Sequence, residues 1–170
     1  MDGQLNKPEK RKMSETTYKI HPPEARWTHV ALRVKNIQET ISWYTENTPL
    51  SLVHYREDET GFAAWLGHKD NPKSPFVLVI SQFFPDKDPF AEAPNTVLGP
   101  FAHFGIELPS LEEIKLAEKE IEKIGSLAMP LTEMPPPIGW IFMAKDPDGN
   151  TLEFSFDQGV YATYQEISKE

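Results

Sequence analysis

Three side chains far apart in the sequence have the chemistry to bind one divalent metal ion: His29, His103 and Glu153. Two imidazoles and a carboxylate suit a borderline divalent cation such as Fe2+, Zn2+, Ni2+, Co2+ or Mn2+. Three protein ligands leave coordination positions open to water or substrate, as a catalytic centre requires. The chain has no cysteine, so any metal must use histidine, aspartate or glutamate.

An internal repeat relates the two histidines. The string WTHVALRV at 27–34 returns as FAHFGIEL at 101–108, and His103 has the same place in the second string as His29 has in the first. Both strings read aromatic, small, histidine, apolar, small, apolar, charged, apolar. Because alternate side chains of a β-strand share a face, each histidine shares its face with the aromatic before it and the small residue after it. The repeat therefore predicts two equivalent strands that each present an imidazole.

The same repeat interval brings Glu153 into the candidate centre. Moving back from Glu153 by the interval that separates His29 from His103 leads to Val79, within the strand-like string PFVLVISQ. Glu153 and Val79 are therefore equivalent positions on the last strand of each half. A twofold arrangement of first and last strands would bring both histidines, Glu153 and Val79 together. Three of these four positions can bind a metal, and no general acid or base is assigned.

The remaining patterns predict the same order of elements in both halves. Asn36 is a candidate N-cap, and Ile37, Ile41 and Tyr44 follow at helical spacing before Pro49. Ser110 repeats the cap at the same interval, and its helix ends at Gly125. The expected strands are 27–34, 50–57, 61–67 and 75–83 in the first half, and 101–108, 127–134, 139–145 and 151–156 in the second.

The predicted fold is α+β, with two tandem βαβββ modules that form a curved mixed β-sheet cup with the helices outside. The expected boundaries are a flexible N-terminal tail at 1–25, a single domain at 26–158 and a C-terminal tail at 159–170. Within the domain, module 1 spans 27–83, a proline-rich linker spans 84–100 and module 2 spans 101–157.

Composition limits the partners. The formal charge of −9 argues against nucleic acid, whose phosphates need a basic face. No apolar run approaches the roughly 20 residues of a membrane span, and the polar first residues lack the apolar core of a secretory signal. We therefore expect a cytoplasmic protein that acts on a small molecule, without nucleic acid or membrane as a partner.

At this point the chain resembles the vicinal-oxygen-chelate superfamily. WTHVALRVKNIQETISWY is similar to the opening of such a module, FAHFGIEL to the second-module strand of glyoxalase I, and KDPDGNTLEF to the terminal turn and strand of glyoxalases and extradiol dioxygenases. The resemblance covers residues 27 to about 157. It implies a divalent metal held by His29, His103 and Glu153, a substrate that chelates the metal through adjacent oxygens, and a possible homodimer.

The resemblance leaves several activities open. Val79 stands where glyoxalase I has a carboxylate or amide, and Met143 stands where extradiol dioxygenases have a tyrosine. A histidine expected near 134–136 in the dioxygenases is missing, and Arg33 and Arg56 are weak candidates for the phosphonate of fosfomycin. We expect glyoxalase-like lyase or isomerase chemistry, or extradiol-type dioxygenase chemistry. The alternative is a non-catalytic drug- or metabolite-binding protein of the bleomycin-resistance type.

Overall fold

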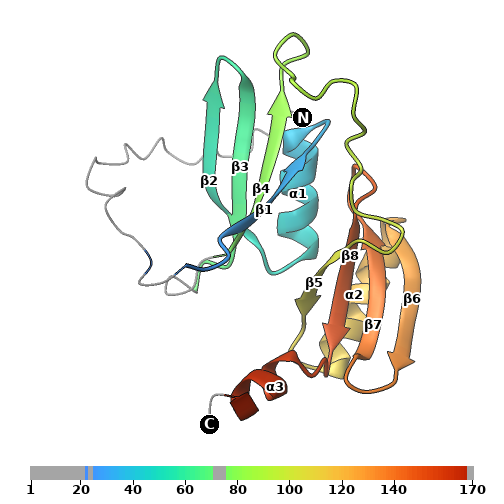
Figure 1. Cartoon of the computed structure of the whole chain (residues 1–170). Helices are drawn as coiled ribbons and strands as arrows, with labels where there is room; N and C mark the ends of the chain where they lie inside the picture. Colours follow the sequence, from blue (N-terminus) through green and yellow to red (C-terminus); the bar gives the residue numbers. More distant parts are fainter. Residues whose placement is uncertain (1–21, 23–24, 71–75, 168–170) are drawn as a thin grey trace.

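The computed structural model describes residues 22, 25–70 and 76–167 of the 170-residue chain, which fold into two βαβββ modules followed by a helix (Figure 1). Module 1 contains β1 (His29–Arg33), α1 (Ile37–Asn47), β2 (Ser51–Asp58), β3 (Gly61–Gly67) and β4 (Val77–Phe83). Module 2 contains β5 (Phe104–Glu107), α2 (Leu111–Lys123), β6 (Leu127–Met134), β7 (Gly139–Lys145) and β8 (Thr151–Phe156). Helix α3 (Val160–Ile167) follows. The predicted α+β fold is confirmed.

Each module forms a mixed four-stranded sheet, and the two sheets have matching registers. The strand orders are β1-β4-β3-β2 and β5-β8-β7-β6, with the first pair in each sheet parallel and the others antiparallel. Ala31 pairs with Val79, and Gly105 pairs with Glu153. The second pair is displaced from the first by the same sequence interval that separates the two histidines. The equivalence of Val79 and Glu153 is therefore structural as well as sequential.

Local capping residues set the helix boundaries. The Asn36 side chain accepts hydrogen bonds from the backbone N–H groups of Gln38 and Glu39 at the start of α1, and Ser110 accepts one from Glu113 at the start of α2. Gly125 follows α2 with φ +72°, a left-handed conformation that glycine adopts without a steric penalty. These contacts satisfy backbone groups that a helix end would otherwise leave unpaired.

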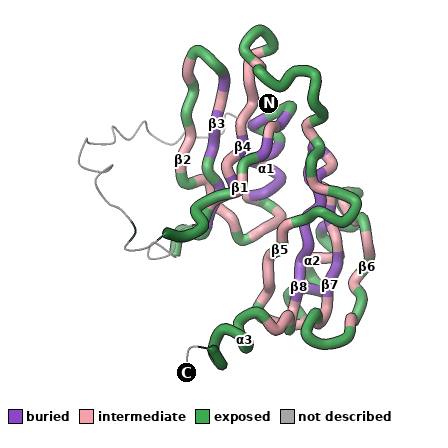
Figure 2. Tube along the Cα trace, in the orientation of Figure 1, coloured by how far each residue is buried: buried purple, intermediate pink, exposed green. Residues whose placement is uncertain are grey.

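Each helix covers one face of its own sheet and leaves the other face open. Helix α1 contacts β2, β3 and β4, and α2 contacts β6, β7 and β8. In Figure 2 the buried residues concentrate in α1 and in the strands next to the two helices. On β1, Leu32 is buried against the core, whereas His29 and Ala31 are exposed. The histidine face of β1 is therefore the face that α1 does not cover.

Within one chain, the two modules meet on their helical sides. Helix α1 contacts α2, and among the described elements no strand of one sheet contacts a strand of the other. The Trp43 Nε1–H donates to Ser126 Oγ over 3.2 Å, and the Lys35 N–H donates to the Asp148 carboxylate. Because α1 and the β7–β8 turn hold the modules in this way, the two sheets stay separate and open in the single chain rather than closing together into one cup.

The chain outside the modules differs from expectation mainly at the C-terminus. Residues 1–21 and 23–24 of the expected N-terminal tail lie outside the described residues. The expected C-terminal tail, 159–170, contains helix α3. None of its residues is buried, so it presents no core-facing apolar stripe of the kind that periodicity detects. Among the described residues, no helix is long and apolar enough to cross a membrane.

Candidate metal centre

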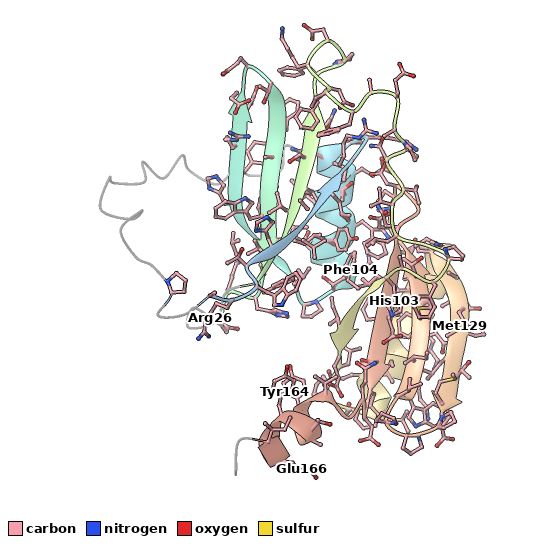
Figure 3. The ribbon with its side chains drawn as sticks, viewed as in Figure 1. Arg26, His103, Phe104, Met129, Tyr164 and Glu166 are labelled. Carbon is pink, nitrogen blue, oxygen red and sulfur yellow. The ribbon has the colours of Figure 1, made fainter. Side chains whose placement is uncertain are left out.

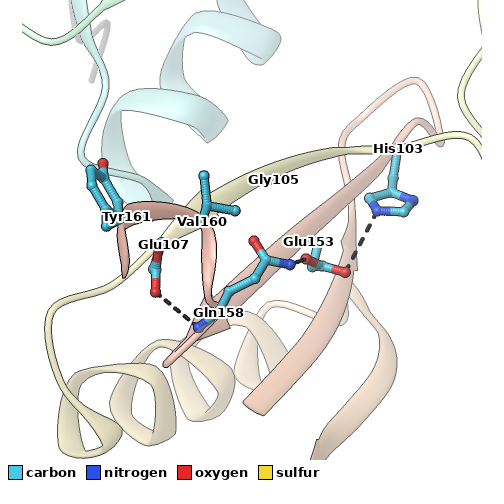
Figure 4. Close-up of a pocket in the computed structure, with 7 residues that line it drawn as sticks. All are labelled: His103, Gly105, Glu107, Glu153, Gln158, Val160 and Tyr161. Carbon is cyan, nitrogen blue, oxygen red and sulfur yellow. Dashed lines mark hydrogen bonds and ion pairs between the residues drawn. The ribbon is translucent and has the colours of Figure 1, made fainter. Parts of the chain in front are cut away.

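His103 and Glu153, two of the three predicted ligands, lie together on the open face of module 2. His103 directly precedes β5, Glu153 lies in the middle of β8, and His103 Nε2 is 3.5 Å from Glu153 Oε2 (Figure 4). The parallel β5–β8 pairing sets this geometry. Gly105 is the partner of Glu153, and a Cβ added there would lie 3.7 Å from Glu153 Oε1. The absence of a side chain at Gly105 keeps the space over the carboxylate open.

A backbone contact orients the His103 ring. His103 Nδ1 lies 2.6 Å from the carbonyl oxygen of Phe101. A carbonyl only accepts hydrogen bonds, so Nδ1 carries the proton and donates. In the neutral ring, Nε2 then carries a lone pair that points toward Glu153 Oε2. Two hydrogen-bond acceptors therefore face each other. A proton or a cation between the two atoms stabilises such a pair.

The pocket around this pair is suited to a cation. It has a volume of about 380 Å³ and is lined by His103, Gly105, Glu107, Glu153, Gln158, Val160 and Tyr161. Two of these residues are carboxylates, and none is a lysine or arginine. Glu153 is only 6% exposed, so water contributes little to balancing its charge. His103 and Glu153 are therefore two side chains of a type that binds divalent metals, placed next to each other in an acidic pocket.

His29, the third predicted ligand, lies elsewhere in the single chain. It is exposed at the start of β1, where its Nδ1 is 2.9 Å from Thr28 Oγ1. Figure 3 shows Arg26, which comes shortly before β1, beside module 1 and well away from His103 in module 2. In the part of the chain that the structure describes, no three histidine, aspartate or glutamate side chains come close enough to hold a metal.

The arginines considered as anion ligands have other contacts. The Arg33 guanidinium forms an ion pair with Asp88 at 2.5 Å and donates to the carbonyl oxygens of Phe90 and Ala93. Arg33 therefore fastens the linker to β1. Arg56 forms an exposed ion pair with Asp58 at 2.9 Å. Neither arginine is among the residues that line the pocket beside Glu153.

Sequence reasoning missed part of the pocket wall. Gln158, Val160 and Tyr161 come from the junction of β8 and α3, in and next to the segment expected to be a tail. Glu107 ends β5, four residues after His103, and the structure places it in the pocket wall. The strongest available signal was alternation along FAHFGIEL, which puts His103, Gly105 and Glu107 on one face.

The family of this chain follows from its match to known proteins. The model of the Glyoxalase/Bleomycin resistance protein/Dioxygenase superfamily matches residues 26–154, most of the chain. The protein therefore belongs to this superfamily, as its paired βαβββ modules also indicate.

Individual relatives are more distant. The uncharacterized protein PA2024 of Pseudomonas aeruginosa is 26% identical over 131 residues, which cover 77% of this chain and 88% of the relative. The structure of the trypanothione-dependent glyoxalase I of Leishmania major matches with a TM-score of 0.60 and 18% identity, over 86% of this chain and 96% of the other. TnmS3, an antibiotic-binding protein from Streptomyces, matches with a TM-score of 0.54 and 17% identity, over 80% and 98%. At these identities the two structures indicate a shared fold alone.

Proposed function

We propose that this protein is a metal-dependent enzyme acting on a small molecule, with a divalent ion held by His103 and Glu153 of one chain and His29 of a second copy. The observation that carries the proposal is the facing of His103 Nε2 and Glu153 Oε2, 3.5 Å apart, while His103 Nδ1 is engaged by the Phe101 carbonyl. A cation between these atoms would remove the conflict between two acceptors.

The second copy is proposed because one chain separates its own candidate ligands. His29 is exposed on the uncovered face of module 1, and His103 and Glu153 line a pocket on the uncovered face of module 2. β1 and β5 are both edge strands, so each has an edge available to another chain. The repeat-equivalent aromatics Trp27 and Phe101 are 85% and 88% exposed beside these strands. In a twofold dimer, each module 1 would face the other chain's module 2 and two identical centres would form.

When bound, a divalent ion supplies Lewis-acid chemistry by polarising a substrate oxygen. The remaining roles belong to the chain. His103 and Glu153 supply their part of the ligand set, and Glu153 brings negative charge. Val160 and Tyr161, the first residues of α3, form one wall of the pocket. The proposed substrate binds through two adjacent oxygens, as the superfamily resemblance implies. The reaction is then a glyoxalase-like lyase or isomerase step, or an extradiol-type dioxygenase step.

A ligand-binding protein without turnover is the second candidate. The wall at Val160 and Tyr161 supports it, because an exposed aromatic and aliphatic surface can hold a planar ligand. The fold shared with the antibiotic-binding TnmS3 is consistent with this role. Assays on hemithioacetals and on catechols, with and without oxygen, separate the candidates. Turnover of either substrate class supports an enzyme, whereas tight binding of a ligand without turnover supports the second candidate.

Metal analysis of the purified, reconstituted protein tests the ligand set. We expect about one divalent ion per chain in the wild type and most of it lost in Glu153→Ala and in His29→Ala, because a ligand is removed in each. His68→Ala is the matched control, since it removes an exposed histidine that lies outside the pocket. Full metal content in the Glu153→Ala variant, or none in the wild type, would contradict the proposed centre.

Mixing two inactive variants tests whether the centre lies between chains. His29→Ala retains His103 and Glu153, and Glu153→Ala retains His29, so a mixed dimer contains one intact centre. After the two variants are unfolded and refolded together, random pairing in a twofold dimer restores roughly a quarter of the wild-type metal content. A centre built within one chain gains nothing from mixing, and the metal content then stays at the level of the single variants.

A further inference from the structure

The turn between β8 and α3 contacts two carboxylates of the pocket through one residue, Gln158. Its side-chain Nε2–H donates to Glu153 Oε1 over 3.0 Å, and its backbone N–H donates to Glu107 Oε1, also over 3.0 Å (Figure 4). Gln158 is therefore next to the candidate metal centre without supplying one of the predicted ligands.

The first of these bonds gives the two oxygens of Glu153 different partners. Oε1 accepts from Gln158, whereas Oε2 faces His103 Nε2. The terminal torsion of a glutamate side chain is broad and nearly twofold, so an unrestrained carboxylate rotates easily. Because Glu153 is buried, a protein donor rather than bulk water must fix its orientation. The Gln158 amide does this and leaves Oε2 as the oxygen that faces the cation site.

Gln158 is itself held in place by its backbone. The bond from its N–H to Glu107 ties the turn to the end of β5, the strand that follows His103. The next residue, Gly159, donates its N–H to the carbonyl oxygen of Pro137 over 2.8 Å, which ties the turn to the β6–β7 connection. A side chain that starts from a backbone fixed on both sides loses less conformational entropy when it forms its hydrogen bond.

We propose that Gln158 is a positioning residue that holds Oε1 of Glu153, so that Oε2 alone is presented with His103 Nε2 to the divalent ion. Partners of this kind orient a ligand and typically change metal affinity by about 10- to 100-fold when they are removed. Gln158 lies beyond residue 154, where the superfamily match ends. The inference rests on the proposed metal centre.

Gln158→Leu tests this role because it removes the amide and keeps the backbone bond to Glu107. We expect the metal dissociation constant, measured by competition with a chelator, to rise about 10- to 100-fold. The metal-free variant should keep the wild-type circular dichroism spectrum, while its unfolding midpoint should fall because the buried Glu153 carboxylate loses a donor. Gln165→Leu is the matched control, since Gln165 is an exposed glutamine on α3 outside the pocket, and it should bind metal as the wild type does.

Cobalt(II) absorption provides a readout that a merely structural role would not move. In Gln158→Leu, Glu153 is free to present both oxygens, so the coordination number should rise and the d–d bands should weaken and shift. In Gln158→Asn, the shorter amide cannot reach Glu153 and the same change is expected.

Two results separate failure of this inference from failure of the proposed function. If wild-type protein binds metal, Glu153→Ala loses it and Gln158→Leu keeps the wild-type affinity and cobalt spectrum, the positioning role is wrong and the metal centre stands. If wild-type protein binds no metal after reconstitution, the proposed metal centre is wrong, and the positioning role that depends on it is wrong as well.

Discussion

The Tyr44 hydroxyl on α1 donates a hydrogen bond to Asp146 Oδ2 over 3.0 Å, and this bond joins module 1 to the β7–β8 turn of module 2. Asp146 also accepts hydrogen bonds from the Asp148 N–H, the Asn150 N–H and the Asn150 side-chain amide. Both Tyr44 and Asp146 are buried. The two modules of one chain are thus locked through a buried polar network and not only through apolar packing.

Tyr44→Phe tests how much the Tyr44–Asp146 hydrogen bond between the modules contributes to stability. Burial, reinforced by the charge of Asp146, raises the pKa of Tyr44 well above its ordinary value, so the hydroxyl is a neutral donor at every practical pH. Its removal takes one donor from a buried carboxylate, and we expect a loss of about 1–3 kcal/mol in the free energy of unfolding in urea. Tyr55→Phe is the control, because the Tyr55 hydroxyl accepts a long hydrogen bond of 3.4 Å from Gln38 near the surface. Equal losses in the two variants would show that the Tyr44–Asp146 bond adds nothing.

Asp148, in the same turn, makes stability depend on pH. Burial raises the pKa of Asp148 above its ordinary value, against the hydrogen bond from the Lys35 N–H, which lowers it, and the charge of Asp146 adds to the rise. A pKa raised on folding means that the folded state favours the protonated form. Its contribution to stability is therefore fully present below the unfolded pKa of about 3.9 and is lost as pH rises through the folded pKa.

Asp148→Asn fixes a neutral side chain that can still accept the Lys35 hydrogen bond. We expect its free energy of unfolding, relative to that of the wild type, to increase as the pH rises from about 4 to about 7. Chemical unfolding at several pH values measures this difference. Asp86→Asn serves as the control, because Asp86 is exposed and its ion pair with Lys87 lies at the surface. A difference between Asp148→Asn and wild type that does not change with pH would rule out Asp148 as the titrating group.

Gly139 and Gly125 offer a matched pair for backbone strain. Both have positive φ, +73° and +72°. A Cβ at Gly139 would lie 2.4 Å from the Phe156 carbonyl oxygen, whereas a Cβ at Gly125 would meet nothing within 4 Å. Gly125→Ala should lower the free energy of unfolding by about 1 kcal/mol, because alanine is less stable than glycine in the left-handed conformation. Gly139→Ala should lower the free energy of unfolding clearly more, because the start of β7 and the end of β8 must move apart to make room for the Cβ. Thermal unfolding midpoints of the two variants measure this difference. Similar midpoints would mean that the backbone at the start of β7 and the end of β8 moves apart without a loss of stability.

The parts of the fold that the sequence predicted are those governed by local chemistry. The strands at 61–67, 127–134, 139–145 and 151–156 have the predicted bounds, and the caps at Asn36 and Ser110 act as expected. Turn residues and capping side chains determine these boundaries within a few residues of themselves. The internal repeat also predicted that Val79 and Glu153 are equivalent positions, and the pairs Ala31–Val79 and Gly105–Glu153 confirm it.

The placement of the modules could not be read in the same way. Tyr44 was interpreted as one position of an apolar stripe, and it is buried as expected, but its hydroxyl also binds Asp146, 102 residues away in the sequence. Whether the two histidine faces meet within a chain or between chains depends on such distant contacts. Helix α3 escaped detection because its exposed residues bury no apolar face. The position of Gln158 depends on where α3 begins, so the sequence did not predict its contact with Glu153 either.

Val79→Glu tests the twofold arrangement by gain of function. Val79 pairs with Ala31 as Glu153 pairs with Gly105, and the exposed Ala31 leaves room for a longer neighbour. In the proposed centre between two chains, a glutamate at this position brings a fourth, charged ligand to the ion. Because added carboxylate ligands tighten binding of divalent cations, we expect the metal dissociation constant to fall by about tenfold or more.

Val53→Glu is the matched control for Val79→Glu, since it adds the same charge at an exposed position on β2, away from the centre. Its metal affinity should equal that of the wild type. The affinity of Val79→Glu is measured by chelator competition, with circular dichroism to confirm that the half-buried substitution folds. If the folded variant binds metal no more tightly than Val53→Glu, Val79 does not face the ion. The pseudo-twofold relation between β4 and β8 would then hold for the backbone alone, because the Val79 side chain would not lie at the same metal centre as Glu153.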